Sequence, residues 1–455
     1  MLETILNKQI NKNIIEFPKY SYIQLNSGNE IYHLKKDKLP ISNIKISFDI
    51  SPKFEDDNHA GIMKFISSLL MYGAGEYNKY ELDDQLSFYG ITISPYITKD
   101  KFYLSVNTLS EYIDKAFYFI KLILTEPHFD INDIQLAKEN LLKYFEHFKI
   151  DNNILLSAIS TLVMYKNHQS YRNFLQGFAN TVDKFDENLI KNYYKNYFTN
   201  TKYKAVITTD LSTLEIENLF NKYLNFNPNI KNPEFDFDLN KLRNTLYIVH
   251  KPEAVQADIL ISNYTTPYNA KNYFAKNIFN RILGSSFNSR LNTVIREKIG
   301  ATYGISSSFS HQIDISTFNI STSIENEKLN LTFKILIDEF EKVKKNITIE
   351  EFEKSKEAYY YKYISFFDKY KNITNYYTNI AEYNLSNEYI ANIKEYIFNI
   401  TLDNIYEEAN NLLNENKVFF IVGDAEKIKK NVADFNFDIK EVDREKIIYK
   451  GMVEI

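Results

Sequence analysis

An arginine and a tyrosine in the second half of the chain carry side chains that suit the stabilisation of negative charge. They are Arg296 and Tyr303, seven residues apart, and Gly300 between them is expected to end a helix. A guanidinium is a permanent fork of hydrogen-bond donors, and a phenol is one donor on a rigid arm. Both groups fit a pocket in which a substrate oxygen becomes negative during reaction. The segment predicts half of an active site; the alternative is an arginine on a solvated helix face and a tyrosine that starts a strand.

The elements around these residues repeat an arrangement found earlier in the chain. A helical pattern that opens at Ile131 recurs at Ile349, 218 residues later. Phe102 in one alternating segment matches Phe318 in another, 216 residues on. The shared order and nearly constant offset indicate a tandem duplication. Each half of about 220 residues groups its strands apart from its helices, which predicts an α+β fold with an antiparallel-rich sheet covered by helices.

A polar segment is expected to join the two halves. Residues 225–234 contain two prolines and four asparagines with little apolar content, which is typical of an interdomain linker. We therefore predict a first domain over residues 1–224, a linker over 225–244 and a second domain over 245–455.

The composition excludes several classes of function. The chain of 455 residues has no cysteine, which rules out disulfides, thiolate zinc sites and cysteine nucleophiles. Its formal net charge of −5 gives no basic footprint for nucleic acid. Because no signal peptide, transit peptide or apolar run of about 20 residues is present, we expect a cytoplasmic protein that does not associate with membranes.

The duplicated halves and the pattern S-R-L-x(4)-R-E-K-x-G-x-x-Y in the second half resemble the pitrilysin, or insulinase-like, family of zinc metallopeptidases. The residues that match are Ser289, Arg290, Leu291, Arg296, Glu297, Gly300 and Tyr303, with Gln256 on the opening strand of that half. The resemblance covers nearly the whole chain. It implies that Arg296 holds a backbone carbonyl of a peptide substrate and that the hydroxyl of Tyr303 helps to stabilise the oxyanion.

The same resemblance implies an inverted zinc motif, H-x-x-E-H, in the first half, and this motif is absent. In the stretch that follows Gly61, Lys64 and Ser68 stand in place of the two histidines, and Ser67 stands in place of the catalytic glutamate. A protonated lysine repels a divalent cation, and hydroxyl groups are poor zinc ligands. We expect no metal in this chain and no independent peptidase activity.

Two further segments in the first half depart from, or only partly keep, the family pattern. A later helix carries Glu139 and Glu146, which resemble the family's paired glutamates. His147 follows Glu146, but consecutive helical residues point about 100° apart, so the pair is interpreted as a relict ligand and a surface histidine. The strand after Gly90 carries Pro95, which removes a backbone donor from the edge that accepts the peptide in the family.

The leading hypothesis is a non-catalytic subunit of a heterodimeric zinc peptidase. A homologous partner would hold the zinc, and this chain would supply Arg296 and Tyr303 in trans to a peptide substrate, for leader-peptide processing or general peptide turnover. The alternative is an inactive structural or peptide-binding member, like the core subunits of the cytochrome bc1 complex. A third reading, a hydrolase with Ser67 or Ser68 as nucleophile, lacks a G-x-S-x-G motif and a matched His/Asp pair.

Overall fold

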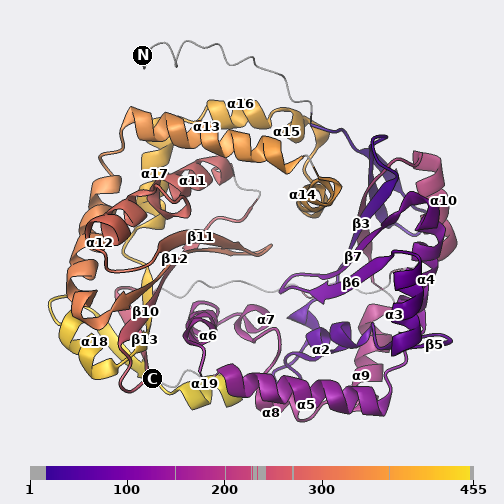
Figure 1. The fold of residues 1–455 in the computed structure, drawn as a ribbon, viewed down its shortest axis with the longest axis horizontal. Coiled ribbons are helices and arrows are strands. Elements are labelled where there is room, and N and C mark those ends of the chain that lie inside the picture. The colour runs from indigo at the N-terminus through magenta and orange to yellow at the C-terminus, as the bar shows by residue number, and fades with distance from the viewer. Residues whose placement is uncertain are drawn as a thin grey trace.

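The computed structural model describes residues 17–148, 150–199, 201–226, 228, 233, 242–268, 271–367 and 369–450 (Figure 1). The predicted linker over residues 225–244 lies largely outside these ranges. The domain boundaries proposed from the sequence therefore remain predictions.

The first half of the chain forms a six-stranded mixed sheet with the order β1-β2-β8-β3-β7-β6. Four of its five strand pairings are antiparallel, and β2 pairs with β8 in parallel. Strand β6 lies at one edge and pairs only with β7. The strands are β1 (Ser21–Gln24), β2 (Glu30–Lys35), β3 (Ile41–Phe48), β6 (Thr92–Ile97), β7 (Phe102–Leu109) and β8 (Tyr203–Thr209).

The second half repeats this sheet nearly strand for strand, in the order β14-β9-β13-β10-β12-β11. In each half a late strand inserts between the two opening strands: β8 lies between β2 and β3, and β13 lies between β9 and β10. Strand β14 has no sequence-based prediction and pairs with β9 in parallel. The strands are β9 (Thr245–His250), β10 (Gln256–Thr265), β11 (Ile305–His311), β12 (Ser316–Glu325), β13 (Val418–Gly423) and β14 (Asp438–Val442).

Helices cover both sheets, which confirms the α+β class and the two similar halves. The helices that open 218 residues apart in the sequence are α5 and α13, each of 18 residues. Side-chain caps define several helix starts; Thr348 and Glu351, for example, form a reciprocal capping box at the start of α13. The helices of the first half used below are α2 (Ile62–Leu69), α3 (Lys79–Phe88), α4 (Ile113–Thr125), α5 (Ile131–Phe148), α6 (Asn152–Met164), α7 (Gln169–Arg172) and α10 (Thr213–Tyr223). Those of the second half are α11 (Tyr273–Asn280), α12 (Leu329–Val343), α13 (Ile349–Phe366), α14 (Tyr370–Glu382), α17 (Leu402–Leu412), α18 (Ala425–Val432) and α19 (Arg444–Lys450).

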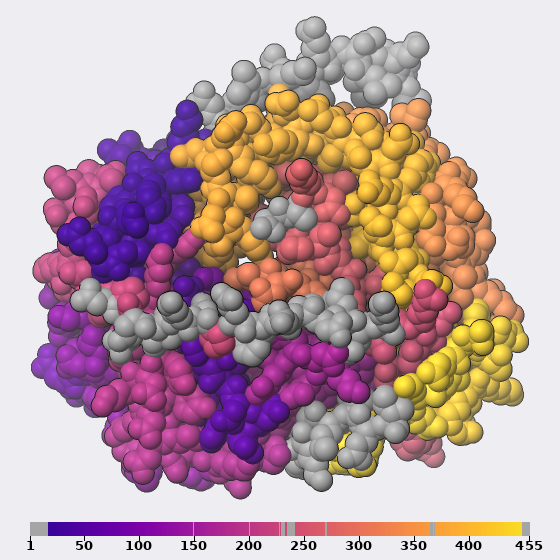
Figure 2. Space-filling view, turned by 180° about the vertical axis from the view of Figure 1, so that it is seen from behind, coloured from indigo at the N-terminus to yellow at the C-terminus, as the bar shows by residue number. Residues whose placement is uncertain are grey.

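Each half sends one helix onto the sheet of the other half. Helix α14 of the second half packs on β3 and β8 of the first sheet, and helix α6 of the first half packs on β10 and β13 of the second sheet (Figure 1). Seen from behind, the two halves occupy opposite sides of the molecule (Figure 2). The halves are therefore tied together by two exchanged helices as well as by the chain itself.

The exchanged helices take part in shared hydrophobic cores. Leu155 and Ile159 of α6 belong to the same buried cluster as Phe420 and Val422 of β13. Ile373 and Ile380 of α14 belong to a second cluster that also holds residues of β2 and β8. Polar contacts add to this packing, since the hydroxyl groups of Thr374 and Thr208 are 2.8 Å apart and buried.

We predict that the two halves unfold together. Ile159→Ala removes a side chain that is 0% exposed and is expected to lower the free energy of unfolding by about 2–5 kcal/mol. The control Ile131→Ala changes a side chain that is 64% exposed and is expected to cost about 0.5 kcal/mol or less. Denaturant unfolding followed by circular dichroism measures both variants. Two separate transitions in Ile159→Ala would contradict the shared cores.

Candidate functional site

The three positions of the lost zinc motif lie on α2, as predicted. Ser67 is 1% exposed and points into the core, and its hydroxyl has no hydrogen-bond partner among the described residues. Ser68 is exposed, and its hydroxyl donates to the carbonyl of Phe65 at 2.6 Å. Lys64 is half-buried on the same helix. None of these side chains offers the lone-pair donor set that zinc requires.

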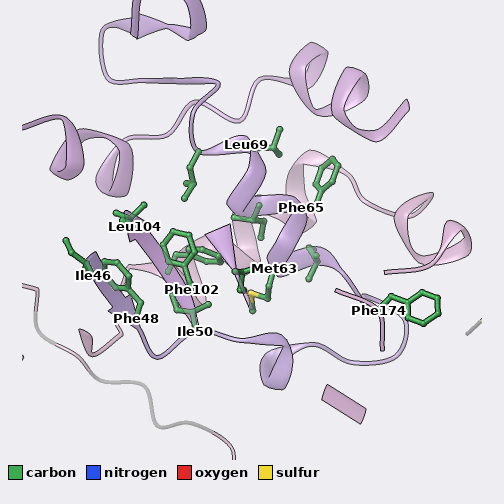
Figure 3. Close-up of a cluster of buried hydrophobic side chains, with 14 of the residues drawn as sticks. Ile46, Phe48, Ile50, Met63, Phe65, Leu69, Phe102, Leu104 and Phe174 are labelled. Carbon is green, nitrogen blue, oxygen red and sulfur yellow. The ribbon is translucent and has the colours of Figure 1, made fainter. Parts of the chain in front are cut away.

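The core contacts that hold α2 in place are intact. Its apolar side chains, including Met63, Phe65 and Leu69, belong to one cluster with Phe48 and Phe102 of the first sheet (Figure 3). Helix α2 also packs against the edge strand β6. Helix α2 therefore packs firmly on the first sheet, although the side chains at its three motif positions do not suit zinc.

Glu55 is a buried carboxylate at the start of α2 that the sequence reasoning did not single out. Its two oxygens accept hydrogen bonds from the backbone N–H groups of Gly61 and Met63, each at 2.9 Å. Burial raises the pKa of Glu55 to about 7, although these two N–H groups and the charge of Lys99 act to lower it. A carboxylate at a helix N-terminus satisfies unpaired donors, so Glu55 acts on the stability and position of α2.

The predicted relict ligands on α5 do not form a metal site. Glu139, Glu146 and His147 are all exposed, and Glu139 accepts a hydrogen bond from Gln135 at 3.0 Å. Across the described ranges of the chain, no three His, Asp or Glu side chains are grouped closely enough to hold a metal ion. The residues present in this half do not fit zinc.

Pro95 lies on the free side of the edge strand β6. The N–H of Thr98 donates to the carbonyl of Lys101 at 2.8 Å and closes the turn to β7. Because hydrogen-bonded and non-hydrogen-bonded pairs alternate in an antiparallel ladder, Tyr96 pairs with β7 through its backbone and Pro95 faces away from it. Pro95 therefore removes a backbone donor from the outer edge of β6 and leaves the pairing between β6 and β7 unchanged.

The segment with the Arg and Tyr begins with a π-helical stretch, Asn292–Lys298, which stops before Gly300 as predicted. Gly300 has a φ of 60°, a left-handed conformation that glycine adopts without strain. The N–H of Ala301 donates to the carbonyl of Ile295 and that of Gly300 to the carbonyl of Arg296, each at 3.1 Å, so the left-handed glycine closes the end of the helix with bonds one residue wider than in a Schellman motif. Tyr303 then lies just before β11.

Arg296 and Tyr303 both remain available on the surface. The guanidinium of Arg296 lies 4.2 Å from the ring centroid of Phe287, a cation–π contact that the sequence reasoning did not foresee. Arg296 has no carboxylate partner among the described residues. Tyr303 is 98% exposed. Among the described residues neither side chain makes an ion pair; Arg296 is half-buried against Phe287, and Tyr303 is almost fully exposed.

Other residues of the same motif hold the segment in place. Arg290 donates to both oxygens of Glu351 at 2.8 Å and to Glu339 at 3.3 Å. Asn292 donates to the carbonyl of Ile305 at 2.8 Å and accepts from its N–H at 3.4 Å. Arg290 thus fixes the segment to α12 and α13, and Asn292 fixes the start of β11 beyond Tyr303.

We predict that the two arginines of the motif differ in their effect on stability. Arg290→Lys loses the fork that binds Glu351 and is expected to cost about 1.5–3 kcal/mol of unfolding free energy. Arg296→Lys is the matched control and is expected to change stability by about 0.5 kcal/mol or less. Denaturant unfolding of both variants measures this difference, and equal costs would contradict the structural assignment.

Comparison with known proteins shows to which family this architecture is similar. A family model described as Insulinase (Peptidase family M16) matches residues 32–174, and one described as Peptidase M16 inactive domain matches residues 184–359. The non-peptidase homolog YmxG of Helicobacter pylori is 23% identical over 325 residues, which cover 70% of this chain and 74% of that protein.

Solved structures share the fold. A peptidase M16 inactive domain from Pseudomonas fluorescens superposes with a TM-score of 0.82 at 18% identity, covering 89% of this chain and 98% of that chain. The periplasmic protease PqqL from Escherichia coli has a TM-score of 0.72 at 13% identity, and the match covers 91% of this chain but 49% of PqqL. The chain therefore belongs to the M16 family, the insulinase-like or pitrilysin peptidases, and its first half lacks the zinc motif of that family.

Proposed function

We propose that this chain is the non-catalytic, cytoplasmic subunit of a heterodimeric zinc peptidase. The observation that carries the proposal is the contrast between the two halves. Helix α2 has lost every zinc-binding side chain, whereas the second half keeps Arg296 and Tyr303 on a segment fixed at both ends.

The exposure of the two retained side chains supports a role outside the chain. Tyr303 is 98% exposed, and Arg296 is not neutralised by a carboxylate among the described residues. A cation–π contact leaves the N–H groups of a guanidinium able to donate, so both the Arg296 guanidinium and the Tyr303 hydroxyl can bind another molecule. In the proposed complex, Arg296 donates to a substrate backbone carbonyl and Tyr303 donates to the oxyanion of the tetrahedral intermediate.

The length comparison supports a second chain. The fold of this chain corresponds to about half of PqqL, with 49% of that protein covered. A partner of similar length would complete an assembly of that size. The metal and the attacking water would come with this partner, and the substrate would be an extended or unfolded peptide.

A second candidate function is an inactive structural or peptide-binding role, like that of the cytochrome bc1 core subunits. The loss of an edge donor at Pro95 and the description of the Helicobacter relative as a non-peptidase homolog favour it. It predicts no peptide hydrolysis with any partner. Reconstitution with a zinc-bearing homologue from the same genome separates the two candidates.

We predict that Arg296→Ala and Tyr303→Phe each lower the turnover of the reconstituted complex by about 10²–10³-fold, as removal of an oxyanion donor does elsewhere. Both variants are expected to keep wild-type stability and partner binding, because Tyr303 is 98% exposed. Lys298→Ala, at an exposed position on the same segment, is the control and is expected to retain activity. Unchanged peptide cleavage in both Arg296→Ala and Tyr303→Phe would rule out the proposal.

We also predict that the purified chain alone contains no stoichiometric zinc and cleaves no peptide. Elemental analysis after dialysis against zinc measures the first, and a fluorogenic peptide assay measures the second. One bound zinc ion per chain would show that a ligand set other than the α2 positions exists and would overturn the assignment of zinc to a partner.

A further inference from the structure

The two hairpins at the sheet edges meet at their tips, at the junction of the halves. The β6–β7 turn spans residues 98–101, and the β11–β12 turn spans residues 312–315. Each turn is closed by the same backbone bond, from Thr98 to Lys101 at 2.8 Å and from Gln312 to Ile315 at 3.0 Å. The third residue of each turn is an aspartate, Asp100 in one and Asp314 in the other. The duplication thus places two equivalent carboxylates opposite each other.

One phenol lies between these carboxylates. The hydroxyl oxygen of Tyr171, a side chain that is 0% exposed, is 2.6 Å from Asp100 Oδ1 and 3.0 Å from Asp314 Oδ2. The remaining oxygen of Asp100 accepts the backbone N–H of Ile313 on the opposite turn at 3.2 Å. Asp100 of the first half is therefore bound directly to the second half.

The number of protons in this cluster decides whether each of its oxygen–oxygen contacts is a hydrogen bond. A phenol has one proton and donates one strong hydrogen bond, whereas an ionised carboxylate only accepts. When both aspartates are ionised, one of the two contacts to Tyr171 brings two oxygens together without a proton between them. A proton on Asp100 completes the chain, because Asp100 then donates to Tyr171 and Tyr171 donates to Asp314.

The nearby cations do not neutralise Asp100. Lys53 pairs with Asp314 at 2.7 Å, and Lys101 pairs with Asp49 at 2.5 Å. Lys99 donates to the carbonyl of Asn173. Asp314 thus has a bonded counter-ion, whereas the hydrogen bonds to Asp100 come from the neutral donors Tyr171 and Ile313, and the charges of Lys53 and Lys99 act on it without an ion pair among the described residues.

Other titratable groups also face the cluster. His168 of the α7 N-terminus stacks on Tyr171 with ring centroids 4.5 Å apart, and burial lowers its pKa. Glu382 of α14 is a third carboxyl nearby; it is half-buried, and burial raises its pKa. Burial likewise raises the pKa of the surrounding tyrosines, Tyr103, Tyr165, Tyr171 and Tyr383.

We propose that Asp100, Tyr171 and Asp314 form a proton-operated latch between the two halves. Uptake of one proton by Asp100 closes the hairpin tips onto each other, and its loss leaves two carboxylates that repel each other and separate the tips. This inference concerns the junction of the halves and does not depend on Arg296, Tyr303 or a partner subunit.

The direction of the pH response follows from the surroundings. Burial raises the pKa of Asp100, although bonds from Tyr171 and Ile313 and the charge of Lys53 act to lower it. For Asp314, the hydrogen bond and charge of Lys53 outweigh burial and lower the pKa. A raised pKa in the closed form means that the stabilisation is complete below the ordinary pKa of an aspartate and is lost as pH rises through the raised value. One linked proton changes the closed-to-open ratio by at most about tenfold per pH unit.

The absence of cysteine allows a direct test on the full chain. Asp84→Cys on α3 and Asp338→Cys on α12 place two spin labels at exposed positions on opposite halves. Pulsed dipolar spectroscopy between about pH 4.5 and about pH 8.5 then reports the distance between the halves. In the otherwise wild-type chain we expect the long-distance population to grow as pH rises.

The variants identify the groups responsible. Asp100→Asn mimics the protonated carboxyl, since its amide donates to Tyr171, and is expected to keep the short distance at every pH. Tyr171→Phe removes the bridge and is expected to give the long distance at every pH. Asp403→Asn, at an exposed position far from the junction in sequence, is expected to behave like the wild type.

Two outcomes would overturn the latch. One is a distance that does not change with pH in the parent chain. The other is a wild-type response in Asp100→Asn, which would assign any pH dependence to another group. The variant Glu382→Gln then tests whether that group is the carboxyl of α14, which makes no contact with Tyr171 among the described residues.

Discussion

The exchange of α6 and α14 between the two halves is the constraint on which the rest of the structure depends. A sheet has two faces, and helices of the same half, such as α4 and α10 or α12 and α18, pack beside only part of each sheet. The helix from the other half packs on the remaining side and joins the two hydrophobic cores. Each half therefore depends on a helix of the other half to bury this side of its sheet.

This constraint also explains how the first half keeps its form after losing its metal site. Metal ligands often contribute to folding, so their loss has to be balanced by other contacts. Here Glu55 caps α2, and Met63 and Phe65 pack against the first sheet. The buried hydroxyl of Ser67 has no partner among the described residues and acts against this stabilisation. In the second half, Arg290 and Asn292 hold a segment on the surface. Its most exposed residue, Tyr303, makes no internal contact among the described residues.

The sequence allowed good predictions wherever the signal is local or repeated. The offset between Phe102 and Phe318, the helix stop at Gly300 and the substituted positions Lys64, Ser67 and Ser68 all depend on spacing along the chain. The comparisons confirm the family resemblance and the α+β fold. The predicted roles of Arg296 and Tyr303 in a partner's site remain predictions, because the chain alone does not contain that site.

What the sequence could not supply are contacts between residues far apart. The insertion of β8 and β13 between the opening strands, and the pairing of β14 with β9, follow from the closure of the whole sheet and not from local pattern. Glu55 looked like any surface glutamate, and Tyr171 was one of 36 tyrosines. Their roles appear only when the turn at Asp100 and the start of α2 are positioned by the fold.

The orientation of Pro95 has a consequence for the behaviour of the protein in a crowded solution. Strand β6 ends the first sheet, and an open strand edge invites pairing with the edge of another molecule. A proline that faces outward interrupts such a pairing without weakening the ladder with β7. Pro95 therefore opposes self-association and aggregation through this edge of the first sheet.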